Sequence, residues 1–347
     1  MNTGQSHLNG RRVLLISLSG YSSGILKKLK ELGAQADLIS DKPDDGFFCK
    51  MLGRLQAGFY QEVLHAYYQK ELVPLKERDY DFIICIRGEY TPVKTLKLLK
   101  SYYPHSRLIL YMWDGLHKFN TRGIEAKWPY YDRVYTFDRM DYENHKTELD
   151  FLPLYYYEDC IPDRMPPADS SRFRYDLSFI GTGHDDRIRI VKNVMDQCAG
   201  SGLRCFSYFY MPHRMIYLKN KALNRDFKNV KKADVRFRML PFQQMYRIYA
   251  HSKCIIDVEN AGQHGLTMRS MEVLGLRRKL VTTNRDIVNY DFYHPDNILV
   301  LDRKNPVIDT GFFKTPYKML NERIYEKYSL SSWIQELLKQ EQPERNC

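Results

Sequence analysis

Residues 254–284 read CIIDVENAGQHGLTMRSMEVLGLRRKLVTTN, and this stretch decides the predicted fold. Its apolar runs at 254–258 and 279–283 are short and rich in Ile, Val, Leu and Thr, as buried strands are. Between them, residues 267–275 have the apolar spacing of a helix. A helix that connects two buried strands is typical of a parallel sheet. The stretch therefore predicts an α/β fold.

The same alternation continues along the rest of the chain. Further strands are predicted at 12–18, 36–40, 81–86, 107–112, 133–137, 149–154, 176–180, 203–208, 235–239 and 298–301. Helices are predicted at 22–32, 60–75, 92–102, 185–198 and 242–250, and in the tail 317–342 with a start signal at Ser332. Short apolar strands separated by helices indicate doubly wound parallel sheets with helices on both faces.

One segment interrupts this rhythm. Residues 158–172 contain three prolines and four acidic residues and have no periodicity. At 347 residues the chain is also about twice the size of a typical domain. We therefore predict two Rossmann-like domains facing a cleft. The predicted parts are an N-terminal domain at 1–157, a linker at 158–174, a C-terminal domain at 175–316 and a helical tail at 317–347.

Composition limits the partners and the compartment. Lys and Arg exceed Asp and Glu by 53 − 42 = 11, which favours an anionic partner: nucleic acid, a membrane surface or a phosphorylated substrate. The seven cysteines are scattered without a C-x-x-C pair, so we expect neither a disulfide framework nor a zinc cluster. No apolar run reaches the length of a membrane span. These features predict a protein of the reducing cytoplasm.

The segment that follows the strand at 254–258 has the residues of an anion-binding site. Thr267 is placed to cap the helix, whose first turn carries Arg269. Arg269 and Glu272 are three residues apart and share one helix face. Backbone N–H groups, the helix dipole and a guanidinium form a cradle for a diphosphate, and Glu272 is placed to accept hydrogen bonds from ribose hydroxyls. The alternative is an ordinary surface Arg–Glu pair.

A second loop, GTGHDDR at residues 181–187, follows the first strand of the second half. Gly181 and Gly183 allow a ligand close to the backbone, and Arg187 is suited to face a phosphate. The alternative is a tight turn that leads into a capped helix.

In the first half, several predicted strands end in polar residues. These are Ser19-Gly20-Tyr21, Arg87-Gly88-Glu89, Trp113-Asp114-Gly115 and Asp138. The carboxyl ends of parallel strands meet at the ligand-binding edge of a sheet. Glu89 and Asp114 are therefore the candidates for a general base, with loop capping as the alternative role.

Residues 20–24 (GYSSG) match the nucleophile elbow G-x-S-x-G of hydrolases. They follow the first predicted strand, however, whereas several strands normally precede an elbow. The chain has no G-x-x-x-x-G-K-[ST], H-E-x-x-H or early G-x-G-x-x-G motif, which argues against a kinase, a metalloprotease or an ordinary dehydrogenase.

Residues 265–284 (GLTMRSMEVLGLRRKLVTTN) resemble the donor-binding region of group 1 glycosyltransferases with the GT-B fold. The run Arg269-Ser-Met-Glu272 before Leu274-Gly275 and the loop Thr182-Gly183-His184 are similar to the CgeB-like branch, which includes spore-maturation and lipopolysaccharide-biosynthesis proteins. The resemblance implies a nucleotide diphosphate-sugar donor. The donor-binding residues that it implies are Gly181, Thr182, Gly183, His184, Arg187, Glu259, Asn260, Gly265, Leu266, Thr267, Arg269 and Glu272.

One position departs from the family pattern. Many retaining members have two glutamates separated by seven residues; the second matches Glu272, but the first falls on His264. His264 is therefore a third catalytic candidate beside Glu89 and Asp114, and the choice between retention and inversion stays open. The triplet Asp79-Tyr80-Asp81 matches the metal-binding D-x-D of the other glycosyltransferase architecture, but it precedes a strand.

The resemblance implies transfer of a sugar to a saccharide or a lipid-linked saccharide in surface polysaccharide or lipopolysaccharide biosynthesis. We expect the reaction to need neither a metal nor a cofactor. Expected partners are the nucleotide-sugar, the saccharide acceptor and, peripherally, the anionic inner face of the plasma membrane; nucleic acid is not expected. The alternatives are a sugar-nucleotide epimerase or hydrolytic relative, and a non-catalytic binding or regulatory protein with the same fold.

Overall fold

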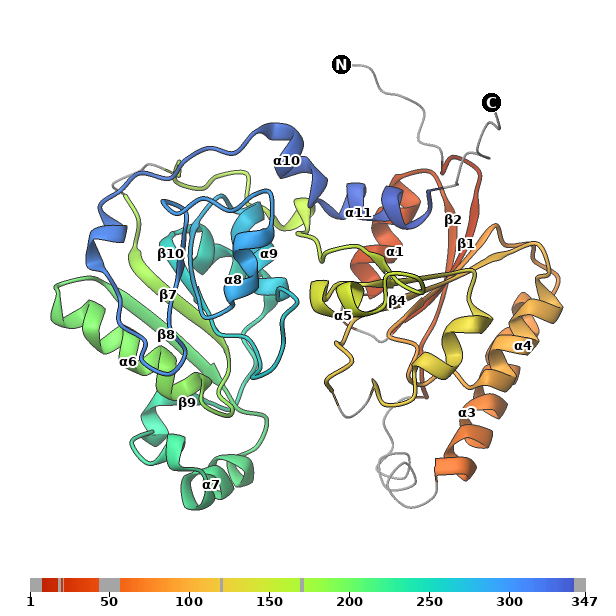
Figure 1. The fold of residues 1–347 in the computed structure, drawn as a ribbon, viewed down its shortest axis with the longest axis horizontal. Coiled ribbons are helices and arrows are strands. Elements are labelled where there is room, and N and C mark those ends of the chain that lie inside the picture. The colour runs from red at the N-terminus through yellow and green to blue at the C-terminus, as the bar shows by residue number, and fades with distance from the viewer. Residues whose placement is uncertain are drawn as a thin grey trace. The chain divides into compact units, whose positions relative to one another are not determined.

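The chain folds into two compact units (Figure 1). The computed structural model describes residues 8–17, 20, 22–43, 57–118, 121–168 and 172–339. Unit 1 contains the described residues up to Pro153 and those from Leu330 onward, and unit 2 spans Leu154–Ser329. Each unit has one six-stranded sheet, and all the strand pairs in both sheets are parallel. The prediction of two doubly wound parallel sheets is confirmed.

Unit 1 has the strand order β2-β1-β3-β4-β5-β6. The strands are β1 (Arg12–Ile16), β2 (Gln35–Ile39), β3 (Phe82–Ile86), β4 (Arg107–Met112), β5 (Arg133–Thr136) and β6 (Asp150–Phe151). The helices are α1 (Ser22–Glu31), α3 (Ala57–Leu72), α4 (Val93–Tyr102), α5 (Arg139–Asn144) and α11 (Leu330–Leu337). Every residue of β3 is buried, as a central strand covered on both faces requires.

Unit 2 has the order β12-β11-β10-β7-β8-β9. The strands are β7 (Tyr175–Thr182), β8 (Cys205–Tyr210), β9 (Val235–Arg236), β10 (Ser252–Asp257), β11 (Lys279–Thr282) and β12 (Ile298–Val300). The helices are α6 (Arg187–Gly200), α7 (Arg214–Leu223), α8 (Phe242–Ala250), α9 (Met268–Gly275) and α10 (Glu322–Lys327). The chain builds the sheet outward from β7 in one direction and from β10 in the other. The strand order therefore reverses between β7 and β10, and such a switch point creates a crevice at the carboxyl edge.

The boundary between the units differs from the predicted linker. Residues 154–157 are buried in unit 2, where the Tyr156 ring lies against Gly275: a Cβ there would stand 2.6 Å from Cγ of Tyr156. The Tyr157 ring packs edge-on against Phe242 at 6.0 Å. Since these aromatic side chains bury themselves in the second core, unit 2 begins before the proline-rich segment.

The C-terminal tail also differs from the prediction. It is not one helix at 317–342: α10 and α11 are separated by Tyr328 and Ser329, and α11 begins at Leu330 and not at Ser332. Residues 317–329 belong to unit 2, whereas α11 returns to unit 1. Trp333 anchors α11 there, with 2% of its surface exposed and its ring 4.8 Å from that of Tyr111. In the described part of the chain, no helix has both the length and the apolar character needed to cross a membrane.

Replacing Trp333 by Ala is expected to lower the free energy of unfolding of unit 1 by about 3–5 kcal/mol, because it removes a large buried aromatic side chain. Urea denaturation followed by circular dichroism measures this change. Glu336→Ala on the same helix is the control, since its side chain is half exposed. Equal midpoints for the two variants would contradict the docking of α11 on unit 1.

Candidate functional site

The predicted site residues of unit 2 gather at the switch point between β7 and β10. The loop after β7 leads into α6, and the loop after β10 leads into α9. Both helices therefore begin at the carboxyl edge of the sheet. This arrangement presents the free backbone N–H groups of two helix starts at one edge, where anions bind favourably.

Arg269 is held inside unit 2 by three partners. Its Nε donates to Oη of Tyr249 at 2.9 Å, its Nη1 donates to Oδ1 of Asp257 at 3.1 Å, and its Nη2 donates to the carbonyl of Ile180. A Cβ at Gly181 would stand 2.7 Å from Nη2, so a side chain there would displace the guanidinium from these hydrogen bonds. Arg269 therefore connects β7, α8 and α9, and its charge is balanced by Asp257.

Asp257 also organises the start of α9. Its Oδ2 accepts hydrogen bonds from Oγ1 of Thr267 at 2.5 Å and Oγ of Ser270 at 3.0 Å. Oγ1 of Thr267 in turn accepts from the backbone N–H of Ser270 at 3.3 Å, which is the helix cap expected from the sequence. The buried carboxylate thus fixes the helix start relative to β10.

Arg187 is buried too, with 8% of its surface exposed, but its partners are neutral. Its Nε donates to the Val258 carbonyl at 2.6 Å, and its Nη1 and Nη2 contact Oγ1 of Thr182, Nε2 of His184 and Oδ1 of Asn260 at 2.8–3.3 Å. In the described part of the chain no carboxylate lies within ion-pair distance of it. Burial and the charge of Arg269 lower the pKa of Arg187 to about 10, so it stays charged at neutral pH.

His184 has its own fixed hydrogen bonds. Because Arg187 donates to Nε2, the imidazole proton lies on Nδ1, which contacts Oδ2 of Asp185 at 2.8 Å. Burial and the neighbouring Arg187 lower the pKa of His184. The imidazole is therefore neutral at physiological pH and helps to orient the guanidinium.

Glu259 is engaged by residues that the sequence interpretation missed. Its Oε2 accepts from Oγ1 of Thr283 at 2.6 Å, and its Oε1 accepts from Nη1 of Arg303 at 2.8 Å. Arg303 also forms two hydrogen bonds with the carboxylate of Asp186, at 2.7 and 2.9 Å. Burial raises the pKa of Glu259. The charge of Arg303 is thus matched by two carboxylates.

Glu272 is the opposite case to Arg187. Only 5% of its surface is exposed, and no hydrogen-bond donor in the described chain reaches its carboxylate. Burial raises its pKa to about 7, although the charge of Arg269 opposes this shift. A ligand hydroxyl group that donates to this carboxylate would favour its charged form and so offset part of the effect of burial.

The loop between β10 and α9 completes the edge. Gly265 and Leu266 are buried, whereas the side chain of His264 is exposed. Nδ2 of Asn284 donates to the carbonyls of His264 and Gly265, at 2.9 and 3.4 Å, and so holds this loop. Gly183 donates its N–H to the Tyr210 carbonyl at 2.9 Å, which places it on the β8 side of the site.

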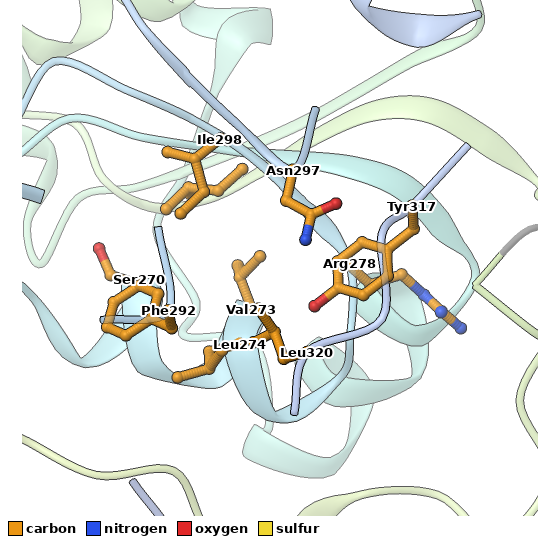
Figure 2. Close-up of a pocket in the computed structure, with 10 residues that line it drawn as sticks. Ser270, Val273, Leu274, Arg278, Phe292, Asn297, Ile298, Tyr317 and Leu320 are labelled. Atoms are coloured by element: carbon orange, nitrogen blue, oxygen red, sulfur yellow. The ribbon is translucent and has the colours of Figure 1, made fainter. Parts of the chain in front are cut away.

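The opposite side of α9 contains a small cavity of about 10 Å³ (Figure 2). Apolar side chains from α9, β11 and β12 surround it, with Arg278 and Tyr317 at one end. This volume holds about one water molecule and no larger ligand. The carboxyl edge is therefore the better candidate for a binding site in unit 2.

In unit 1, the two candidate bases lie on either side of Arg87. Nε of Arg87 is 3.2 Å from Oε2 of Glu89, and its Nη2 is 3.5 Å from Oδ2 of Asp114, which is also paired with Lys118. The backbone of Arg87 is left-handed, with a φ of 78°, which turns the chain sharply after β3. Burial raises the pKa of Glu89.

Other sequence motifs have ordinary structural roles. Asp138 caps α5, accepting from the backbone N–H of Met140 at 3.0 Å. Asp81 lies at the amino end of β3, where it accepts from Nη1 of Arg11 and the backbone N–H of Arg12. Two strand-end residues of the first loop, Ser19 and Tyr21, lie outside the described residues. Among the described residues, no group of three or more His, Cys, Asp or Glu is arranged to hold a metal ion.

The most informative comparison with known proteins is that of structures. No family model and no curated protein sequence matches this chain. A glycosyltransferase from Rickettsia africae superposes with a TM-score of 0.57 at 10% identity, covering 96% of this chain and 100% of that one. HepE from Anabaena, solved with UDP and glucose, gives 0.57 at 11% identity over 94% and 98%. The lipopolysaccharide outer core galactosyltransferase WaaB gives 0.52 at 12% identity over 94% and 99%. The chain therefore has the two-domain GT-B fold of these glycosyltransferases.

Proposed function

We propose that this protein is a glycosyltransferase that binds a nucleotide diphosphate-sugar at the carboxyl edge of unit 2. The observation that supports this most directly is the contrast between Arg187 and Glu272. Among the described residues, no carboxylate forms an ion pair with the buried Arg187, and no donor forms a hydrogen bond with the carboxylate of Glu272. A diphosphate joined to a ribose would supply both missing partners.

Arg187 and the starts of α6 and α9 would bind the diphosphate. During transfer, negative charge develops on the leaving diphosphate, and fixed donors that point at it lower the barrier. Arg269 is a positioning residue in this scheme, because its three nitrogens already have protein partners. These cationic and backbone groups take the role that a metal ion has in other enzymes, so the proposed reaction needs no metal.

The proposed acceptor side is unit 1. Burial raises the pKa of Glu89, which is the direction of shift that a carboxylate needs to act as a general base near neutral pH. Asp114 is the second candidate. We propose a saccharide or a lipid-linked saccharide as acceptor, in lipopolysaccharide or surface polysaccharide biosynthesis. The similarity of residues 181–184 and 269–275 to the CgeB-like branch and the fold shared with WaaB support this assignment.

Nucleotide binding provides the first test of this proposal. A panel of UDP, ADP, GDP, CDP and their sugars is expected to contain a ligand that raises the melting temperature of the protein. Replacing Arg187 by Met, or Glu272 by Ala, is expected to weaken that ligand at least tenfold, since each loses a charge-assisted hydrogen bond worth about 1.5–3 kcal/mol. Calorimetry measures the affinity, and Glu326→Ala, which changes an exposed glutamate, is the control. No shift with any member of the panel, or equal affinities in all variants, would contradict the assignment.

Affinity is also expected to depend on pH. Only the ionised carboxylate of Glu272 accepts two hydroxyl hydrogen bonds, and its pKa is about 7 before the ligand binds. The affinity for the nucleotide-sugar should therefore fall by up to about tenfold as the pH drops from 8 to 6, because the ionised fraction of Glu272 falls by that factor. A nucleotide-sugar is the right probe because its diphosphate does not titrate in this range. Glu272→Gln should bind weakly and without this pH dependence; an equal slope in both proteins would assign the titration to another group.

The acceptor side is tested by turnover. Glu89→Gln is expected to lower kcat by about 100-fold or more, as loss of a general base does, while the Kd of the donor stays unchanged because unit 2 provides its binding residues. Asp114→Asn is the matched comparison. A larger fall in kcat for Asp114→Asn would move the assignment to that residue, and full activity in both variants would exclude both.

A further inference from the structure

The short helix α7 has its apolar side turned to solvent. Figure 1 shows α7 at one end of unit 2, and Tyr217 is its only buried residue. Oη of Tyr217 donates to the Val230 carbonyl at 3.3 Å. One turn later, Nζ of Lys221 donates to the carbonyls of Phe227, Lys228 and Val230 at 2.6–3.3 Å. These bonds fix which side of α7 faces the protein.

The side of α7 away from Tyr217 carries Met215, Leu218 and Ala222, at the i, i+3, i+7 spacing of one helix face. Leu223 lies beside them. The exposed fractions of Met215, Leu218 and Leu223 are 80%, 62% and 76%. An ordinary surface helix turns its apolar stripe to the core and its charges to water. Here the stripe is exposed, and this arrangement indicates an interaction surface.

The surroundings of α7 are strongly basic. Residues 211–240 contain nine Lys and Arg but only two acidic residues, Asp226 and Asp234. Both acids are paired with cations of α6: Asp226 with Arg189 at 2.6 Å, and Asp234 with Lys192 at 2.8 Å. Within the described chain, no acidic side chain pairs with the exposed cations Lys219, Arg225, Lys228 and Lys232. We call these four cations and the exposed Met215, Leu218 and Leu223 the α7 surface.

We propose that the α7 surface docks on an anionic lipid bilayer. The apolar side chains of a short helix that lies flat at a bilayer enter the boundary between headgroups and acyl chains, and flanking Lys and Arg bind lipid phosphates. Nucleic acid would use the cations but not three exposed apolar side chains. An apolar protein groove would cover the apolar side chains but leave the cations unmatched. An anionic bilayer provides phosphates for the four cations and an apolar boundary for Met215, Leu218 and Leu223.

The position of α7 connects this surface to the candidate site. The helix begins four residues after β8 ends, and β8 pairs directly with β7. The chain therefore leaves the sheet for α7 at the carboxyl edge, where the loops that lead to Arg187 in α6 and Arg269 in α9 also begin. Membrane docking does not depend on the proposed transferase activity, so the two proposals fail or succeed separately.

Co-sedimentation of the full chain with vesicles tests the proposal. Vesicles of phosphatidylcholine with about one-third phosphatidylglycerol should bind the protein, and phosphatidylcholine alone should not. Raising the salt from about 0.1 to about 0.5 M should weaken binding. The double variants Met215→Ser/Leu218→Ser and Lys219→Glu/Arg225→Glu should each bind about tenfold more weakly or worse, because each removes two groups of the α7 surface.

Matched controls change exposed groups elsewhere in unit 2. Val288→Ser/Val307→Ser removes two exposed apolar side chains, and Lys304→Glu/Lys314→Glu reverses two exposed charges. Both should bind vesicles like the unaltered protein, and all variants should keep its melting temperature. The proposal is overturned if the protein ignores anionic vesicles, or if the α7 variants bind as well as the controls. It is also overturned if the protein forms a dimer that the α7 variants abolish while vesicles bind neither form.

Discussion

The buried ion pair between Asp257 and Arg269 is the constraint on which the candidate site depends. It lies at the point where the strand order of unit 2 reverses, and it connects β7, β10, α8 and α9 through hydrogen bonds with defined partners. Burying two charges costs free energy that their attraction does not always recover. The pair is therefore better explained by the position it imposes on the start of α9 than by stability. It also makes Gly181 necessary, because a side chain there would collide with the guanidinium.

Three buried or half-buried arginines converge on this edge, but only one keeps an unbalanced charge. Arg269 faces Asp257, and Arg303 faces Asp186 and Glu259, whereas Arg187 has only neutral acceptors. The carboxylate of Glu272 accepts no hydrogen bond from the described residues. Burial disfavours the charged form of both groups. It lowers the pKa of Arg187 to about 10 and raises that of Glu272 to about 7. In the proposed function, a ligand that is anionic at one end and carries hydroxyl groups at the other would relieve both, which is our reason to propose a nucleotide and not a simple phosphate.

Most of the fold was predictable because buried parallel strands carry a strong local signal. Each predicted strand is present, although β6 and β9, at the sheet edges, are shorter than their apolar runs suggested. Helix α7 was missed because its apolar residues face outward, so its pattern does not mark a core-facing stripe. The site was only partly predictable. Loop position and helix spacing made Arg187 and Glu272 candidates, but Tyr249 and Arg303 act through contacts with residues 20 or more positions away, and no local sequence pattern indicates such contacts. The sequence also could not show that all three nitrogens of the Arg269 guanidinium donate to groups of the protein itself.

The exposed face of α7 gives a physical reason to choose among the anionic partners that composition alone left open. The excess of 11 positive charges favours any anionic partner, and dispersed charges do not select one. At one end of unit 2, the structure exposes an apolar helix face in a segment that also carries exposed cations, and the combination is selective because the two kinds of side chain need different environments. Water hydrates the cations but leaves the apolar side chains of Met215, Leu218 and Leu223 exposed. An apolar partner would cover those three side chains but give the cations no counter-charge. The boundary of an anionic bilayer has both environments in the right order. A lipid-linked acceptor would lie in that same boundary, so docking there would confine the search for the acceptor to two dimensions.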